Sequence, residues 1–98
     1  MYILVVYDIN FDDDNGKNRL RKVAKLCEDY GIRVQNSVFE LNIDNTKYME
    51  LKNKLKKEIA EDKDSIRFYK LGKNINNSLE IIGKESNIEI TQSTTFIF

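Results

Sequence analysis

Residues 2–7, YILVVY, form an uninterrupted run of β-branched, aliphatic and aromatic side chains that decides the fold. Six residues are too few for a helix, and such a run is typical of a central strand buried on both faces of a sheet. The run stops at Asp8, and the acidic, turn-rich residues 10–16 that follow predict a loop. The chain therefore opens with a strand that other strands must flank.

Two amphipathic helices are predicted further along the chain. Residues 17–30 carry an apolar face with steps of three and four, and Gly31 ends this helix. Residues 47–60 carry a second apolar face, preceded by the helix-capping side chains of residues 44–46. The first face consists of Leu20, Val23, Ala24, Cys27 and Tyr30, and the second of Tyr48, Leu51, Leu55 and Ile59.

The remaining segments are predicted to be extended. Residues 33–43 are rich in β-formers but long for one strand, so they form two short antiparallel strands with a break near Asn36-Ser37, or one sharply bent strand. Residues 65–71 predict a further strand, and residues 72–77 a turn. Short β-like pieces follow at residues 79–82, 88–90 and 94–98.

This order of elements predicts an α+β fold of the ferredoxin-like type: a βαββαβ antiparallel sheet with both helices on one face, plus a C-terminal β extension. Residues 1–72 are predicted to form the core, and residues 73–98 a β-rich tail of the same single domain. Two helices cover one face of the sheet, so the other face should be largely apolar. The tail or a second copy of the chain is expected to cover it, and we therefore expect a homodimer.

Composition excludes several kinds of chemistry. The 98 residues include no His and one Cys, which excludes a Ser-His-Asp triad, a Cys-His pair and an imidazole zinc site. Cys27 cannot form an internal disulfide, and a lone thiol is consistent with the reducing cytoplasm. Since no apolar run approaches 18 residues, no membrane span is expected.

Basic residues are concentrated in one segment, although the whole chain has no net charge. The segment from Lys17 to Arg33 contains six basic residues and two acidic residues. Guanidinium groups bind phosphates through two hydrogen bonds, so Arg19, Arg21 and Arg33 are candidate nucleic-acid ligands. The alternative is an ordinary solvated helix face with ion pairs four residues apart.

Asp8 is the most notable acidic residue, because it ends the most hydrophobic strand. Its carboxylate either accepts hydrogen bonds from loop amides or binds a hard cation such as Mg²⁺, which takes few protein carboxylates. Two copies of Asp8 brought together in a symmetric dimer would make a more convincing metal site.

The other candidate residues are less informative. Residues 12–16 lack the spacing of an EF-hand and indicate a solvated loop. Ser37 has no base to activate it as a nucleophile, and aromatic residues such as Tyr7 and Phe39 could stack on bases but are more often core.

Four segments together resemble the CRISPR-associated Cas-two family. They are VVYDI (5–9), RLRKVAKLC (19–27), YGIRVQNSVFE (30–40) and DSIRFY (64–69), in the same order and at similar distances. The similarity covers residues 1 to about 72, and the tail matches loosely. Many family members carry an aromatic residue where this chain has Asn36.

The resemblance implies a CRISPR adaptation subunit: a homodimer that bridges integrase (Cas-one) subunits and holds double-stranded protospacer DNA, with the C-terminal strand reaching over to the partner. It also implies a Mg²⁺-dependent endonuclease of RNA or DNA, with Asp8 as metal ligand and catalytic residue. Arg19, Arg21 and Arg33 then belong to nucleic-acid-binding motifs, and Tyr7, Ser37 and Phe39 are supporting residues. The alternatives are an autonomous, toxin-like metal-dependent ribonuclease of the same fold that cuts single-stranded RNA, and a binding module with no nucleic-acid role.

Overall fold

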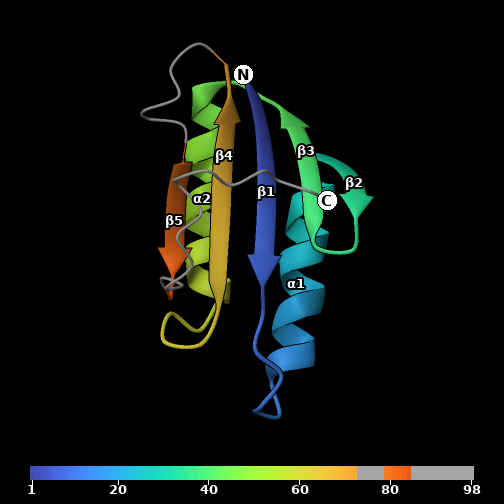
Figure 1. Cartoon of the computed structure of the whole chain (residues 1–98), viewed down its shortest axis with the longest axis vertical. Coiled ribbons are helices and arrows are strands. Elements are labelled where there is room, and N and C mark those ends of the chain that lie inside the picture. Colours follow the sequence, from blue (N-terminus) through green and yellow to red (C-terminus); the bar gives the residue numbers. More distant parts are fainter. Residues whose placement is uncertain (73–78, 85–98) are drawn as a thin grey trace, which may run out of the picture.

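The computed structural model describes residues 1–72 and 79–84, which form one five-stranded sheet and two helices (Figure 1). Within these residues neither helix is long and apolar enough to span a membrane. The elements are, in chain order, β1 (Tyr2–Asp8), α1 (Gly16–Glu28), β2 (Gly31–Gln35), β3 (Val38–Asn42), α2 (Asn45–Glu58), β4 (Ser65–Leu71) and β5 (Leu79–Gly83).

The sheet has the strand order β2-β3-β1-β4-β5, and every neighbouring pair is antiparallel. Both helices lie behind it in Figure 1, on the same face. The predicted ferredoxin-like α+β fold is therefore confirmed. The two strands on either side of β1 are β3 and β4, which makes YILVVY the central strand of the five-stranded sheet.

Of the two alternatives for residues 33–43, the pair of short strands is the right one. β2 and β3 form a hairpin whose turn lies at residues 36–37, where the break was expected. The register shifts between Arg33 and Gln35, which marks a β-bulge near the end of β2. This hairpin places β2 at the edge of the sheet.

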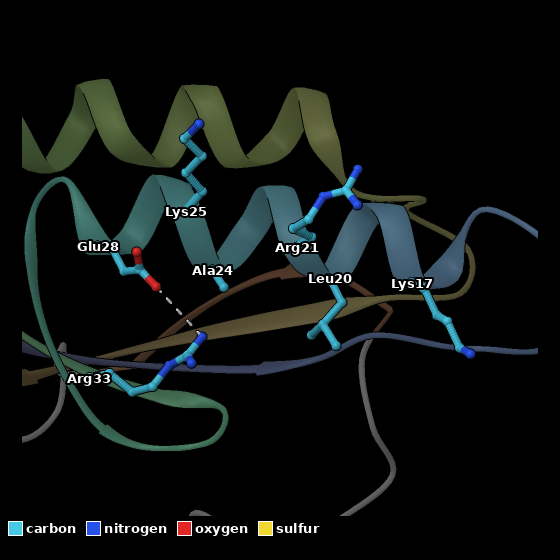
Figure 2. Close-up of a pocket in the computed structure, with 7 residues that line it drawn as sticks. All are labelled: Lys17, Leu20, Arg21, Ala24, Lys25, Glu28 and Arg33. Atoms are coloured by element: carbon cyan, nitrogen blue, oxygen red, sulfur yellow. Dashed lines mark ion pairs between the residues drawn. The ribbon is translucent and has the colours of Figure 1, made fainter.

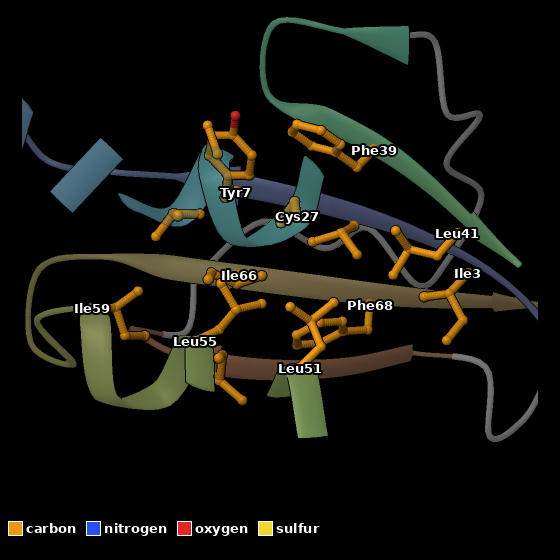
Figure 3. Close-up of a cluster of buried hydrophobic side chains, with 14 of the residues drawn as sticks. Ile3, Tyr7, Cys27, Phe39, Leu41, Leu51, Leu55, Ile59, Ile66 and Phe68 are labelled. Atoms are coloured by element: carbon orange, nitrogen blue, oxygen red, sulfur yellow. The ribbon is translucent and has the colours of Figure 1, made fainter. Parts of the chain in front are cut away.

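The core lies between the helices and the sheet (Figure 3). β1 contributes alternate residues, and α1 and α2 contribute most of the apolar faces that their periodicity predicted. Cys27 is fully buried, and this burial raises the pKa of its thiol to about 12, so the group behaves as a small apolar side chain. The fully buried side chains include Ile3, Val5, Val23, Phe39, Leu41, Leu51, Leu55, Ile66 and Phe68.

The second face of the sheet carries an apolar stripe, as predicted. Leu4 and Val6 are half-buried there, while Tyr2 and Leu71 are each 51% exposed. Because Tyr69 is opposite Leu4 and Leu71 is opposite Tyr2, the stripe runs across β1 and β4. Polar residues interrupt it on the β3 side, where Glu40 and Asn42 are exposed.

β5 confirms the strand predicted at residues 79–82, and it pairs with β4 of the same chain. The Glu80 carboxylate of β5 contacts both α2 and β4. The Nζ atoms of Lys52 on α2 and Lys70 on β4 each lie 3.0 Å from a carboxylate oxygen of Glu80, and the Tyr48 hydroxyl on α2 donates a hydrogen bond to the same carboxylate. The strands predicted at residues 88–90 and 94–98, and the packing of the tail on a partner, lie outside the described residues.

Glu80 should make the stability of the protein sensitive to acid. Burial alone would raise the pKa of Glu80, but hydrogen bonds from Tyr48, Lys52 and Lys70 outweigh it and lower the pKa from 4.5 to about 2. A pKa depressed in the folded state stabilises the fold above pH 4.5, and this contribution is lost as the pH falls through about 2. Because a third of the side chain is exposed, the contribution at pH 7 is on the order of 1 kcal/mol.

The measurement compares the wild type with Glu80→Gln by urea unfolding between pH 2 and pH 7. The wild type should be the more stable protein at neutral pH, and the difference should shrink between pH 4.5 and pH 2. A difference that stays constant over this range would show that Glu80 is not ionised and bonded as described.

Candidate functional site

Four cationic side chains surround a groove between α1 and β2, which we call the basic groove (Figure 2). The groove has a volume of about 420 Å³. Glu28 supplies one carboxylate, so the lining has a net charge of +3. The cations are Lys17, Arg21, Lys25 and Arg33, and Leu20 and Ala24 supply apolar lining.

Three of the four cationic side chains are exposed and have no carboxylate partner among the described residues. Lys17, Arg21 and Lys25 are exposed, and within residues 1–72 and 79–84 they form no ion pair. Their spacing of four residues places them in one row along α1, which is why a single helix can supply all three. Arg21 Nη2 donates to Asn18 Oδ1 at 2.5 Å, a contact that leaves its charge uncompensated.

Arg33 reaches the groove from β2 and is oriented from two sides. Its Nη2 lies 3.9 Å from Glu28 Oε1, and its guanidinium lies 5.2 Å from the centre of the Phe39 ring. Arg33 is opposite Phe39 in the hairpin, so the strand register creates this contact. Its side chain is 45% exposed, which leaves the guanidinium accessible to an anion.

Tyr7, Ser37 and Phe39 support the end of the hairpin that carries Arg33. The Tyr7 and Phe39 rings stack at 6.1 Å, the Tyr7 hydroxyl donates to the Asn36 carbonyl at 3.0 Å, and the Tyr7 N–H donates to the Ser37 carbonyl at 3.1 Å. Burial raises the pKa of Tyr7 although Arg33 acts in the opposite direction, so the hydroxyl stays a donor. Since Tyr7 and Phe39 are both buried, neither is available to stack on a base.

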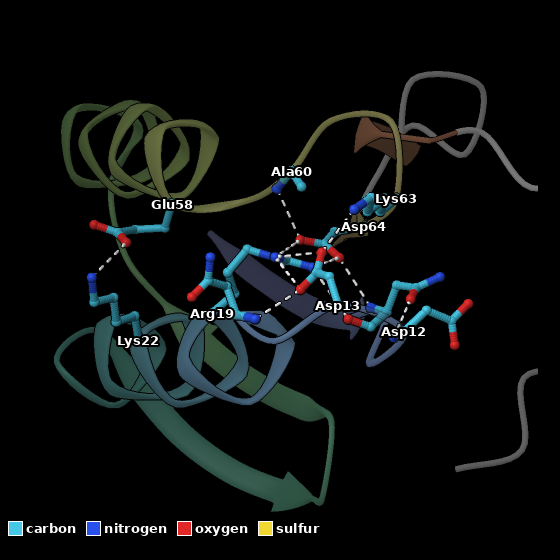
Figure 4. Close-up of polar contacts among 10 residues, drawn as sticks. Asp12, Asp13, Arg19, Lys22, Glu58, Ala60, Lys63 and Asp64 are labelled. Atoms are coloured by element: carbon cyan, nitrogen blue, oxygen red, sulfur yellow. Dashed lines mark hydrogen bonds and ion pairs between the residues drawn. The ribbon is translucent and has the colours of Figure 1, made fainter.

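Arg19 lies outside the basic groove, unlike Arg21. Its Nε is 2.7 Å from Asp64 Oδ2, and its Nη1 is 3.0 Å from both Asp13 carboxylate oxygens (Figure 4). Only 12% of the side chain is exposed. Two residues apart on a helix is about 200° of rotation, so Arg19 and Arg21 leave α1 on nearly opposite sides.

Asp64 is a residue whose importance the sequence analysis missed. It is the one fully buried charged residue among those described, and its carboxylate accepts hydrogen bonds from Arg19 and from the N–H groups of Asn10 and Ala60. Burial alone would raise the pKa of Asp64, but these hydrogen bonds outweigh it and lower the pKa. Lys63 and Arg19 likewise hold the pKa of Asp13 below its ordinary value. The group is therefore an ionised network.

A signal for Asp64 was present in the sequence, but it was weak. An Asp directly before the apolar strand 65–71 must cap or pair with something once that strand is buried. Its cationic partner, however, lies 45 residues earlier in the chain. No spacing rule connects two positions so far apart.

Asp8 ends β1 and is exposed on the face of the sheet opposite the helices. Ile3, Val5 and Tyr7 are buried toward the helices, and the alternation of the strand turns Asp8 the other way. It is opposite Ser65 of β4, and Arg67, which was also missed, faces the same side opposite Val6. An exposed carboxylate with no partner among the described residues can accept a ligand from outside.

The sheet therefore separates the predicted site residues. Arg21 and Arg33 lie together at the basic groove on the helix side, and Asp8 lies on the opposite face. No group of three or more metal-ligating side chains occurs within residues 1–72 and 79–84. A single chain thus supplies a cationic groove and a lone carboxylate at different places.

Known proteins resemble the chain over most of its length. The family model for CRISPR associated protein Cas2 matches residues 1–78. A CRISPR-associated endonuclease Cas2 of Halalkalibacterium halodurans is 45% identical over 98% of this chain and the whole of its own length. A CRISPR-associated endoribonuclease Cas2 of Nitratidesulfovibrio vulgaris is 47% identical over 85% of this chain and 81% of its own.

The fold gives the same result as the sequence. The crystal structure of Streptococcus pyogenes Cas2 at pH 6.5 superimposes with a TM-score of 0.69 and 53% identity, over 78% of this chain and 92% of that one. The relatives from Halalkalibacterium halodurans and Nitratidesulfovibrio vulgaris are named as nucleases. The chain belongs to the Cas2 family of CRISPR associated proteins.

Proposed function

We propose that the chain is a cytoplasmic CRISPR adaptation subunit that acts as a homodimer, binding double-stranded protospacer DNA together with integrase (Cas-one) subunits. The observation that carries the proposal is the basic groove, where Lys17, Arg21 and Lys25 keep uncompensated charges beside Arg33. Cations arranged along one helix suit the regular spacing of a phosphate backbone and carry little base readout. In a symmetric dimer the groove occurs twice.

Hydrolysis of a phosphodiester is the second part of the proposal, and Asp8 would carry it. Mg²⁺ binds through one or two carboxylates and keeps several waters, so an exposed, unpartnered Asp8 fits the ion. Bound there, the ion would lower the pKa of a water and neutralise a phosphate oxygen. Because one chain offers a lone carboxylate, we propose that the second Asp8 comes from the partner subunit.

An autonomous ribonuclease is the competing proposal. It is favoured by the endoribonuclease names of several relatives and by the lack of any His-based nucleophile in this sequence, which leaves metal-assisted hydrolysis as the available chemistry. Such an enzyme would cut single-stranded RNA without an integrase partner and would not need to bind a duplex.

The test compares Arg21→Ala/Arg33→Ala and Asp8→Asn with the wild type, with Lys56→Ala/Lys57→Ala on the exposed side of α2 as the matched charge control. Losing two phosphate contacts should reduce the slope of log K against log salt by roughly 2, measured with a fluorescent DNA duplex between 50 and 300 mM salt. The control should keep the wild-type slope. Asp8→Asn should bind like the wild type and lose cleavage by roughly 100-fold.

Two results would contradict the proposal. If the groove variant and the control weaken binding equally, the groove is not the DNA site. If the purified protein cuts single-stranded RNA and fails to bind a duplex even at 50 mM salt, the ribonuclease is the better description. Spacer acquisition in cells with the integrase, measured for Asp8→Asn, separates the two roles, since an adaptation subunit keeps it without cleavage.

A further inference from the structure

The geometry points to Asp64, acting with Arg19, as a positioning residue that holds Asp8 in place through the backbone of Asn10. This inference rests on the proposed function, because the proposed function makes Asp8 the carboxylate that carries phosphodiester hydrolysis. It gives Arg19 a different role from Arg21 and Arg33, with which the sequence motif groups it. Arg19 orients the chain beside the carboxylate and does not bind nucleic acid.

The first step of the argument is how completely Asn10 is held. Asn10 is two residues beyond Asp8, and its N–H donates to Asp64 Oδ1 at 3.0 Å. Its carbonyl accepts from Arg19 Nη2 at 3.2 Å. Both polar backbone groups of Asn10 are thus bound by the two members of one buried ion pair, Asp64 and Arg19, which Figure 4 labels.

The second step is that Asp8 is held on its other side as well. It is opposite Ser65 in the β1–β4 register, and Ser65 directly follows Asp64. The sheet therefore holds the backbone up to Asp8, and the Asp64–Arg19 pair holds it from Asn10 onward. Two such attachments fix the backbone of Asp8 and so set the position from which its carboxylate extends, which is what a single catalytic carboxylate needs.

The third step shows that Asp64 is itself anchored independently of this loop. Asp64 Oδ2 accepts from the Ala60 N–H at 2.8 Å, just beyond α2. The Asp64 carbonyl accepts from the Lys84 N–H at 2.7 Å, just beyond β5. Asp64 is therefore fixed by α2 and β5, and the loop after Asp8 is attached to it.

The fourth step concerns the charge of Arg19. Its guanidinium forms ion pairs with Asp64 and Asp13, so its positive charge is balanced by carboxylates. Asp13 also pairs with Lys63, whose Nζ lies 2.9 Å from Asp13 Oδ2. An arginine that is 12% exposed and doubly paired has little to offer a phosphate. Arg21, two positions on, is exposed and unpaired in the described part of the chain.

The experiment compares Arg19→Lys and Asp64→Asn with Lys22→Arg, a charge-conserving control at an exposed residue of the same helix outside the basic groove. Arg19→Lys keeps the charge of Arg19 but loses its fork of donors. For a fluorescent single-stranded RNA with Mg²⁺, we expect Arg19→Lys and Asp64→Asn to lower kcat by roughly 10- to 100-fold, with KM and the salt slope of binding within twofold of the wild type. Lys22→Arg should leave kcat unchanged.

A second readout does not depend on cleavage. Amide hydrogen exchange by NMR should be faster at Asn10 in Arg19→Lys and Asp64→Asn, while Val5 in the middle of β1 stays protected. Leu55→Ala, a destabilised core variant, is the control for a general loss of stability. It should speed amide exchange across the core without a particular increase at Asn10. If the wild type cuts nothing, the nuclease part of the proposed function fails, and this exchange pattern alone decides whether Asp64 positions the segment.

Two results would overturn the inference. Wild-type exchange at Asn10 in both variants would show that the pair does not hold this segment. A rise in KM with unchanged kcat in Arg19→Lys, together with a salt slope reduced by about one in Arg19→Ala, would show that Arg19 binds phosphate after all.

Discussion

Asp64→Ala is expected to lower the free energy of unfolding by roughly 3 kcal/mol, at the low end of the range for breaking a buried ion pair. The change leaves the N–H groups of Asn10 and Ala60 without their acceptor and removes one of the two carboxylates that bind Arg19. Because Arg19 keeps Asp13, its buried charge is not fully uncompensated, which is why the low end applies.

Urea unfolding at pH 7 measures this effect, and Asp62→Ala is the matched control. Asp62 is an exposed aspartate in the same loop, and its loss should change the stability by less than about 0.5 kcal/mol. Equal stability of Asp64→Ala and Asp62→Ala would mean that the network contributes nothing.

Gly83→Ala is expected to lower the free energy of unfolding by roughly 2–5 kcal/mol, the sum of a left-handed backbone and a forced shift of packed atoms. Gly83 has φ +93°, which side chains other than glycine rarely adopt. A Cβ there would lie 2.2 Å from the Asp64 carbonyl oxygen and 3.1 Å from Ile59 Cδ1. Glycine is therefore required where β5 ends against Asp64.

Gly72→Ala provides the control for this prediction. No atom lies within 4 Å of a Cβ built at Gly72, so alanine there should be neutral or stabilise by up to about 1 kcal/mol through the unfolded state. Thermal unfolding of both variants gives the comparison.

Much of the fold was predictable from local pattern. The apolar run of β1 and the 3.6-residue spacing in α1 and α2 predicted those elements to within about two residues, because each pattern reports which side of its own element is buried. The choice between one bent strand and two at residues 33–43 was not predictable. It depends on whether β2 finds room beside β3, which is a property of the whole sheet.

The candidate site was predictable in part. The concentration of cations on α1 indicated the basic groove, and the position of Asp8 at a strand end indicated an unusual carboxylate. Helical geometry alone could have separated Arg19 from Arg21, since residues two positions apart on a helix leave it on nearly opposite sides. The role of Asp64 and the placement of Arg67 beside Asp8 were beyond such reasoning, since both depend on how β4 pairs with β1.

The sequence by itself determined the order and type of the elements, the family, and the local excess of positive charge on α1, because these depend on residues close together in the chain. Only the tertiary structure decided which arginine is consumed in an ion pair, and that Asp8 and the basic groove lie on opposite faces of the sheet. The physical reason is that burial and pairing are long-range. Asp64 lies 45 residues after Arg19 in the chain, and their contact exists only once α1 and the start of β4 have been brought together.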